Sequence, residues 1–362
     1  MTSALVPKVP KHQKLTEILR RQLEGGELRP GDRLPSFAEL RERYGISQAT
    51  IERIYVTLEQ DGLVVREQGR GTFVAQMAPR PSTGMIGVAS PDRSEWQHSL
   101  YWALLLDGIT EAATRHNLQA LLIDNAASFN QWEKVEGAIV NGASRAMVAG
   151  RIEARTPCVA MLVAQPGIAS VVADDYNGAY SAMTHLLELG HRRIAFLGWG
   201  TDPLSTLRVA AYNDALQAAG LELNPALVRA LQAPYTQDEP FVNQGRDRMR
   251  EWLAQDWRQL KPTALVTLND HVAVGAIEML IAHGIGVPQQ VSVVGFDGTE
   301  LYDYFSPKLT TIEVPLKSIG AAAAEILIRQ INGEATAPAA VSLPTRLRIG
   351  QSTGPPPAQA KK

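Results

Sequence analysis

The sequence predicts an α/β protein in which a small helical domain ending in a β-hairpin precedes a larger α/β region. Three observations support this fold class. Residues 33–74 carry two short helical patterns followed by a hairpin pattern, and residues 76–84 are rich in turn-forming residues. The chain beyond them alternates strands with helices, which is typical of parallel sheets with crossover helices.

A capping box predicts the start of one N-terminal helix. Ser36 stands three residues before Glu39, the spacing at which the two side chains satisfy each other's free backbone N–H groups. We therefore expect a helix over residues 37–43 and a turn over residues 44–46. A preceding helix is predicted over residues 14–24, where apolar residues recur at helical spacing.

A second helix and a hairpin follow the turn. Ser47 can cap this helix, which should end near Gln60. Its apolar side chains at helical spacing are Ile51, Ile54, Tyr55 and Leu58. Residues 63–65 and 72–74 suit two strands, with residues 67–71 as a glycine-bearing turn. Two short helices and a hairpin predict a winged helix-turn-helix, a fold that reads DNA.

Four motifs in this stretch carry a family resemblance. LPSFAEL, YGIS, LEQDGL and GRGTFV resemble, in this order, the N-terminal domain of GntR-family transcription regulators over about residues 12 to 75. The resemblance implies that the second helix enters the major groove, where base edges present a readable pattern of donors and acceptors. The wing would then contact phosphates or the minor groove.

This assignment yields a set of candidate DNA-binding residues. They are Ser36, Arg41, Arg43, Ser47, Gln48, Ala49, Thr50, Arg53, Arg66, Arg70 and Gly71. The chain departs from similar family members at Phe37-Ala38, Gln48 and Glu52, where they usually carry Glu-Arg, Arg and Arg. Gln48 predicts a changed base preference, because glutamine pairs with adenine and arginine with guanine. Glu52 would repel a nearby phosphate. A solvated surface side chain is the alternative for each arginine.

Composition and charge describe an ordinary globular chain of 362 residues with a formal net charge of -2. Residues 1 to 80 carry 13 Lys and Arg against 10 Asp and Glu, whereas the rest carries 22 against 27. This asymmetry fits a DNA-binding domain on an acidic body. The N-terminus lacks a secretory signal and no apolar run is long enough to span a membrane, so we expect a soluble, cytoplasmic protein without membrane partners.

Cysteine and histidine usage excludes two classes of site. The single cysteine, Cys158, cannot form an intramolecular disulfide and is predicted to be a small buried hydrophobic residue. None of the seven histidines has metal-ligand spacing. The sequence therefore predicts no metal site and no cofactor.

The larger region begins with a regular alternation of elements. Strands are predicted over residues 85–89, 118–123, 137–140 and 158–163, and a helix over residues 100–116. After Asp124, only NAASFNQWEKVE separates two strands, which is barely enough for a crossover helix.

From Val171 the chain is similar to the effector domain of LacI/GalR-type repressors. VVADDYNGAYSAMTHLLELGHRRIAFLG and PTALVTLNDHVAVGAIEMLIAHGIGVPQQVSVVGFDG are two of the matching blocks, and the resemblance covers about residues 84 to 353. It implies two doubly wound α/β lobes of periplasmic-binding-protein-like type and, with the GntR-like head, an arabinose-repressor type of architecture. We expect domains at residues 1–75 and 85–354, joined by a linker at 76–84 and followed by a tail at 355–362.

Ligands of this fold bind beyond the carboxyl ends of the strands. Asp270 follows the strand predicted at 264–268, Asp297 follows the strand at 291–296, and Arg208 opens the helix after the loop 198–206. The resemblance points to the same places and adds Asn269. Carboxylates, an amide and an arginine suit the hydroxyls of a sugar or polyol.

The opposing lobe offers Asp92, Trp96 and Trp102 as further effector contacts. Each candidate has a plain structural alternative. Asp297 can hold a turn, Asp270 can cap a helix over residues 271–283, and the tryptophans can pack inside their lobe. Asp174 and Asp175, at the entry to the second lobe, are interpreted as helix-starting or hinge residues.

The function predicted is that of a homodimeric repressor whose operator binding responds to a small sugar-like effector. A regulator that keeps the effector domain only as a dimerisation scaffold is the alternative, motivated by the short segment after Asp124. An enzyme is not expected. The sequence lacks G-x-G-x-x-G after a strand, a G-x-S-x-G elbow and a Walker-type loop.

Overall fold

The computed structural model describes most of the chain, in two compact units that span Met1–Ser82 and Thr83–Lys362. The described residues are 15, 19, 28, 31–60, 64–67, 69–74, 83–90, 100–124, 134–141, 157–198, 203–231, 241–299, 305–334 and 339–358. The predicted helix over residues 14–24 lies almost entirely outside them, apart from the buried side chains of Leu15 and Leu19.

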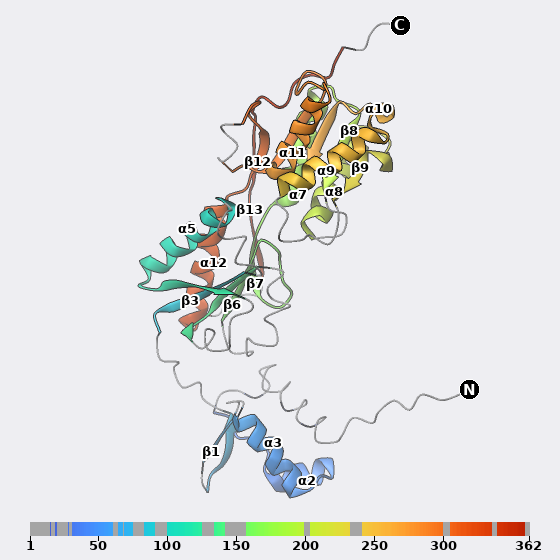
Figure 1. Ribbon diagram of the computed structural model, residues 1–362. Helices are drawn as coiled ribbons and strands as arrows, with labels where there is room; N and C mark the ends of the chain where they lie inside the picture. Colours follow the sequence, from blue (N-terminus) through green and yellow to red (C-terminus); the bar gives the residue numbers. More distant parts are fainter. Residues whose placement is uncertain are drawn as a thin grey trace, which may run out of the picture. The chain divides into compact units, whose positions relative to one another are not determined.

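In the described part of the first unit, two helices precede a hairpin (Figure 1). The elements are α2 (Phe37–Tyr44), α3 (Gln48–Gln60), β1 (Val64–Glu67) and β2 (Gly71–Val74), and the two strands pair antiparallel. The predicted capping box is confirmed, because Ser36 Oγ accepts from the Glu39 N–H and the Glu39 carboxylate accepts from the Ser36 N–H. Gly45, in the left-handed conformation with φ 60°, ends α2.

Apolar side chains from both helices and the hairpin make one small core. The buried members are Leu15, Leu19, Leu34, Leu40, Ile46, Ile51, Ile54, Tyr55, Leu58, Val64 and Val74. The Tyr55 hydroxyl donates to the Pro35 carbonyl, and Arg33 forms a β-bridge with Phe73. The segment before α2 is therefore fixed against both α3 and the returning strand of the hairpin.

The second unit holds two sheets, each with helices packed on it (Figure 1). Lobe 1 has a wholly parallel sheet in the order β13-β7-β6-β5-β3-β4. Its strands are β3 (Met85–Ser90), β4 (Gln119–Asp124), β5 (Ala138–Asn141), β6 (Cys158–Met161), β7 (Ala169–Ala173) and β13 (Ala340–Leu343). Helices α5 (Leu100–Arg115) and α12 (Leu316–Ile331) pack against this sheet.

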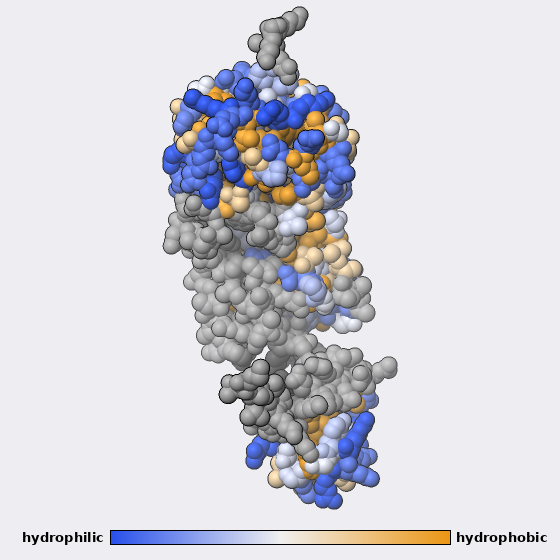
Figure 2. Space-filling model, turned by 90° about the vertical axis from the view of Figure 1, so that its right-hand side faces the viewer, coloured by the Kyte–Doolittle hydropathy of each residue, from blue (hydrophilic) through white to orange (hydrophobic). Residues whose placement is uncertain are grey.

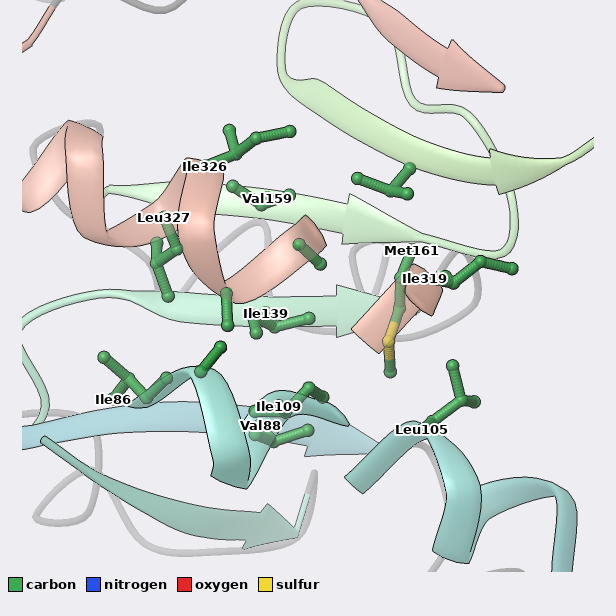
Figure 3. Close-up of a cluster of buried hydrophobic side chains, with 14 of the residues drawn as sticks. Ile86, Val88, Leu105, Ile109, Ile139, Val159, Met161, Ile319, Ile326 and Leu327 are labelled. Atoms are coloured by element: carbon green, nitrogen blue, oxygen red, sulfur yellow. The ribbon is translucent and has the colours of Figure 1, made fainter. Parts of the chain in front are cut away.

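Figure 3 shows how the core of lobe 1 joins these elements: Ile86 and Val88 of β3, Ile139 of β5, and Val159 and Met161 of β6 meet side chains of α5 and α12. The two helices also approach each other closely. A Cβ on Gly108 of α5 would lie 1.9 Å from the Lys317 carbonyl oxygen, so only glycine fits there.

Lobe 2 has the sheet order β14-β12-β11-β10-β8-β9, parallel except for β14. Its strands are β8 (Ile194–Gly198), β9 (Val228–Ala230), β10 (Ala264–Thr267), β11 (Ser292–Asp297), β12 (Thr310–Glu313) and β14 (Arg346–Arg348). Its helices are α7 (Asp175–Glu188), α8 (Pro203–Ala218), the 3-10 turn η2 (Pro225–Leu227), α9 (Phe241–Ala254), α10 (Trp257–Leu260) and α11 (Asp270–Ala282). Because helices cover both faces of the sheet, two separate apolar cores result.

The chain passes between the lobes three times: from β7 to α7, from β12 to α12, and from β13 to β14. Hydrogen bonds tie the crossing segments together. The Asp174 N–H donates to the Leu343 carbonyl at 2.9 Å, and the Thr345 hydroxyl donates to the Asp174 carbonyl at 3.2 Å. The Val314 N–H donates to the Asp297 carbonyl at 3.1 Å, which attaches a crossing segment to a candidate effector residue.

Two local predictions need correction. Cys158 is partly exposed at the start of β6, where it packs beside a core cluster without being enclosed by it. Strand β6 ends at Met161, because Leu162 adopts φ 69° and turns the chain. The crossover after Asp124 lies mostly outside the described residues. Within the described part of the chain, no helix is long and apolar enough to cross a membrane.

Candidate DNA-binding and effector sites

The N-terminal turn of α3 presents polar side chains outward. Ser47, Gln48, Ala49 and Arg53 are exposed, whereas Thr50 is half-buried. The Ser47 hydroxyl oxygen accepts from the Thr50 N–H at 3.3 Å and lies 2.8 Å from the Thr50 hydroxyl. The same serine thus starts the helix and organises its first turn, which leaves Gln48 and Arg53 free to reach base edges or phosphates.

The candidates on and before α2 have different roles in the structure. Arg41 and Arg43 lie exposed in the last turn of α2, with the Arg43 guanidinium 5.7 Å from the Tyr44 ring centroid. Ser36 is exposed, but its side chain is occupied by the capping box. A contribution of Ser36 to DNA binding would therefore act through the start of α2.

The wing carries three predicted residues with distinct surroundings. Gly71 has φ 122°, a conformation that favours glycine. Arg70 pairs with Glu67, and its guanidinium lies 5.7 Å from the Phe73 ring centroid. Arg66 contacts Glu52 of α3, so the carboxylate expected to repel phosphate is already paired with a cation.

In lobe 2, a buried ion pair forms the centre of the candidate effector site. Arg208 donates from Nε and Nη2 to Asp175 Oδ1 at 2.9 and 2.7 Å, and its Nη1 donates to the Leu268 carbonyl. Its guanidinium carbon lies 3.5 Å from the Phe296 ring centroid. Arg208 lies in the second turn of α8, which begins at Pro203, so the expectation that it opens the helix was wrong by one turn.

The start of α11 assigns different roles to two neighbouring residues. Asn269, not Asp270, is the N-cap, and its Oδ1 accepts from the Val272 N–H at 2.9 Å. Asp270 is fully buried and accepts from the Gly298 and Thr299 N–H groups and the Thr311 hydroxyl. It therefore holds the loop after β11 from beneath.

Asp297 ends β11 in an unusual backbone conformation, with φ 117°. A non-glycine residue in this region is strained, and such strain is concentrated at binding sites. The adjacent Gly298 is required for space, because a Cβ there would lie 2.5 Å from the Glu313 Cα atom. Burial, and then the nearby Asp270, raise the pKa of the Asp297 carboxyl well above its usual range.

Tyr101 of α5 adds a residue from lobe 1 that the sequence did not indicate. Burial raises the pKa of its phenol well above the usual value, and the charges of Asp297, Arg208 and Asp175 also act on it. The neighbouring Trp102 is only 6% exposed and lies in the core of lobe 1, as in the packing alternative. Asp92 and Trp96 lie outside the described residues.

The candidate site in lobe 2 therefore consists of Asp175, Arg208 and Asp297, and their charges also act on Tyr101 of lobe 1. Donors and acceptors of this kind can bind hydroxyl groups, and the Phe296 ring adds an apolar surface. No group of three or more His, Cys, Asp or Glu that could hold a metal ion occurs among the residues that the structure describes.

The two buried carboxyls predict a pH dependence of stability. Burial raises the pKa of Asp270 to about 7, whereas unfolded aspartate has a pKa of about 3.9. The native state then binds more protons at this carboxyl than the unfolded state does, so Asp270 makes the free energy of unfolding decrease as pH rises from about 4 to 7. Burial lowers the pKa of His185, His191 and His271, and these groups act in the opposite direction. The decrease should reach up to about 1.4 kcal/mol per pH unit for each carboxyl.

Urea unfolding monitored by tryptophan fluorescence measures this effect, because all six tryptophans lie beyond residue 82. Asp297→Asn should flatten the pH dependence, since it removes one charge of the interacting pair. A pH dependence of unfolding that is the same in Asp297→Asn and in the unaltered protein would contradict the prediction.

Known protein families match both the N-terminal and the C-terminal part of the chain. Residues 11–74 match the model of bacterial regulatory proteins of the gntR family, and residues 183–353 match the periplasmic binding protein-like domain. The arabinose metabolism transcriptional repressor of Geobacillus stearothermophilus is 27% identical over 357 residues, covering 89% of this chain and 92% of the relative. The regulator AscG of Escherichia coli (strain K12) is 29% identical over 308 residues, covering 78% and 88%.

A solved structure matches nearly the whole chain. The transcriptional regulator CelR-cellobiose complex superimposes with a TM-score of 0.66 at 22% identity, covering 96% of this chain and 100% of that one. At this identity the likeness concerns the fold. The two family matches, together with the regulators that are similar over most of the chain, identify it as a DNA-binding transcription regulator. It has a GntR-family N-terminal domain and a LacI/GalR-type, periplasmic-binding-protein-like effector domain.

Proposed function

We propose that this regulator is a repressor whose operator binding is controlled by a small, sugar-like effector bound between the two lobes. The observation that carries the proposal is the buried ion pair of Arg208 and Asp175 in lobe 2, together with Asp297 at the carboxyl end of β11. The charges of these three residues also act on Tyr101 of lobe 1. The relatives agree with the proposal, since one is named a repressor of arabinose metabolism and another structure is a cellobiose complex.

The chemistry of this site favours a neutral, hydroxyl-rich ligand. Asp297 can accept from a hydroxyl group, and the two guanidinium N–H groups of Arg208 outside its bonds to Asp175 and Leu268 can donate to one. The Asn269 side-chain oxygen accepts the helix-capping hydrogen bond from the Val272 N–H, so its amide nitrogen can donate to a ligand. Several such hydrogen bonds at fixed positions are what distinguishes one sugar from another.

Control of DNA binding would follow from a shift between lobe arrangements. An effector that contacts Tyr101 and Asp297 together favours the arrangement in which the lobes approach each other, and the three crossing segments between the lobes accommodate the change. As a DNA-binding regulator, the protein would bind chromosomal DNA in the cytoplasm.

A homodimer would convert this shift into altered DNA affinity, because two heads must match two half-sites. Apolar area is exposed among hydrophilic residues on the face of lobe 2 shown in Figure 2. The large hydrophobic side chains exposed in the described part of this lobe are Leu207, Leu223, Ile281 and Ile349. Such area is available for a subunit contact.

A thermal-melt screen of the full-length protein against monosaccharides, disaccharides and sugar phosphates tests the effector proposal. A ligand at about 100 times its Kd adds about 2.7 kcal/mol of stability, so the melting temperature of the effector domain should rise by roughly 5–10 °C. Asp297→Asn should abolish the rise, whereas Asp247→Asn, on the exposed face of α9, should retain it.

The same ligand should change operator affinity in a DNA-binding assay. A chain that gains no stability from any compound of the panel, and whose DNA affinity is equally unaffected, would instead support the alternative in which the effector domain is a dimerisation scaffold.

A further inference from the structure

Arg66 of the wing is held by side-chain and backbone groups of α3. Its Nη1 donates to Glu52 Oε1 at 2.5 Å, its Nη2 donates to the Glu52 carbonyl at 3.3 Å, and its Nε lies 3.2 Å from Glu59 Oε2. Glu52 and Glu59 are seven residues apart, two turns along one face of the helix. The Arg66 side chain is only 28% exposed. This arginine thus joins β1 to the DNA-reading helix, and two carboxylates of that helix offset its charge.

Arg33, unlike Arg66, is not held by any carboxylate that the structure describes. It is exposed, and its backbone is fixed by the bridge to Phe73. Its guanidinium lies along the wing turn, since a Cβ on Gly71 would be 2.9 Å from Arg33 Nε and 3.3 Å from Nη2. Glycine at position 71 therefore provides the space in which this side chain lies. Among the described residues, Arg33 forms no ion pair with a carboxylate.

The two arginines border one open hollow of about 550 Å³, which Glu67, Gly69, Arg70, Gly71 and Thr72 also line. Arg70 is paired with Glu67, and Arg66 with Glu52 and Glu59. Arg33 is then the arginine of this hollow that forms no ion pair among the described residues, and the open space at Gly69 lets an anion approach the backbone closely. The chemistry fits a phosphate diester, to which guanidinium groups bind with charge-assisted hydrogen bonds.

We propose that Arg33 binds a DNA phosphate at the wing, and that Arg66 is a positioning residue which fixes the wing against α3 through Glu52 and Glu59. The inference rests on DNA binding by this domain and assigns new roles within it. Glu52 accordingly serves the positioning of the wing instead of repelling DNA. Arg66 does not count among the phosphate contacts.

The salt dependence of DNA binding tests the assignment on any duplex, because it counts neutralised phosphates. The full-length protein and its variants are titrated with a mixed-sequence duplex between about 50 and 200 mM salt. Arg33→Gln should lower the slope of log K against log salt by about 0.9 for each head bound. Arg33→Lys should keep the slope, since it keeps the charge.

A charge-neutral double variant serves as the matched control. Glu52→Gln with Arg66→Gln removes one charge of each sign, so the slope should stay at its original value. On a duplex enriched by the unaltered protein from a random pool, this double variant should bind at least about fivefold more weakly, because the wing is no longer held in register.

The reverse pattern of slope changes in the two variants would overturn the assignment. A reduced slope for the double variant together with an unchanged slope for Arg33→Gln would make Arg66 the phosphate ligand. If the single variant Arg66→Gln bound the enriched duplex as tightly as the unaltered protein does, Arg66 would have no positioning role. Failure of the unaltered protein to bind any duplex at low salt would contradict DNA binding itself, and the two failures are thereby distinguishable.

Discussion

Replacing Arg208 with methionine should lower the free energy of unfolding of the effector domain by about 3–5 kcal/mol. The substitution leaves Asp175, which is only 3% exposed, as a buried carboxylate without its cation. Arg208 also acts to lower the pKa of Asp297, so its loss removes a favourable charge interaction with that carboxyl. Urea unfolding followed by tryptophan fluorescence measures the loss, and it should exceed that of most single substitutions.

Two matched variants separate the buried ion pair from a general effect of removing an arginine. Asp175→Leu with Arg208→Met should recover most of the stability, because an apolar pair can replace a buried ion pair at little net cost. Arg250→Met, which breaks the exposed pair with Asp247, should cost less than about 1 kcal/mol. Equal losses for Arg208→Met and Arg250→Met would show that the ion pair is not a stabilising feature of the site.

The recovered double variant also distinguishes stability from ligand recognition. It should fold well and still fail to respond to an effector, because it lacks the guanidinium that would donate to the ligand. A stable double variant that keeps its effector response would exclude Arg208 from the binding site.

The sequence predicted those elements whose signals are local. The capping box at Ser36 and Glu39, the apolar spacing in α3 and the alternation of strands and helices depend on neighbouring residues, and each matches the structure closely. Positions at strand ends, such as Asp297, were likewise accessible, because the carboxyl end of a parallel strand is where this fold binds ligands.

The pairings within the site are not local, and the sequence did not disclose them. Asp174 and Asp175 were both interpreted as helix-starting or hinge residues. Asp174 is indeed the N-cap of α7, but Asp175 turns inward and meets Arg208, 33 residues away. Consecutive residues of a helix point about 100° apart, so a run of two aspartates does not reveal which of them faces a distant partner.

The same helix geometry explains why the sequence pointed to Trp102 as an effector contact, whereas the structure points to Tyr101. Both are aromatic and adjacent at the start of α5, and one of them must face the core of lobe 1. The structure directs Trp102 inward and leaves Tyr101 near the charges of lobe 2. The return of α12 to lobe 1 was also unpredictable, because an amphipathic helix records that it has an apolar face but not which sheet that face will cover.

Gly320→Ala should destabilise the effector domain by about 1–3 kcal/mol, although helix propensity alone predicts a gain of about 1 kcal/mol. Gly320 lies inside α12, and a Cβ there would be 2.1 Å from the backbone oxygen of Leu105 in α5. Since a carbonyl oxygen of another helix cannot rotate away, α5 and α12 must separate. Urea unfolding followed by tryptophan fluorescence decides between the two signs.

Gly286→Ala is the matched control, because the nearest atom to its added Cβ is the mobile Gln289 Oε1 at 3.2 Å. Its effect should be small, as expected where the native backbone accepts alanine. The separation of α5 from α12 also has a functional consequence. Helix α5 carries Tyr101, so Gly320→Ala should weaken effector binding as well as stability. A variant that unfolds more easily yet binds effector unchanged would show that Tyr101 does not contribute to the site, and the ligand would then be recognised by the residues of lobe 2 together with other parts of lobe 1.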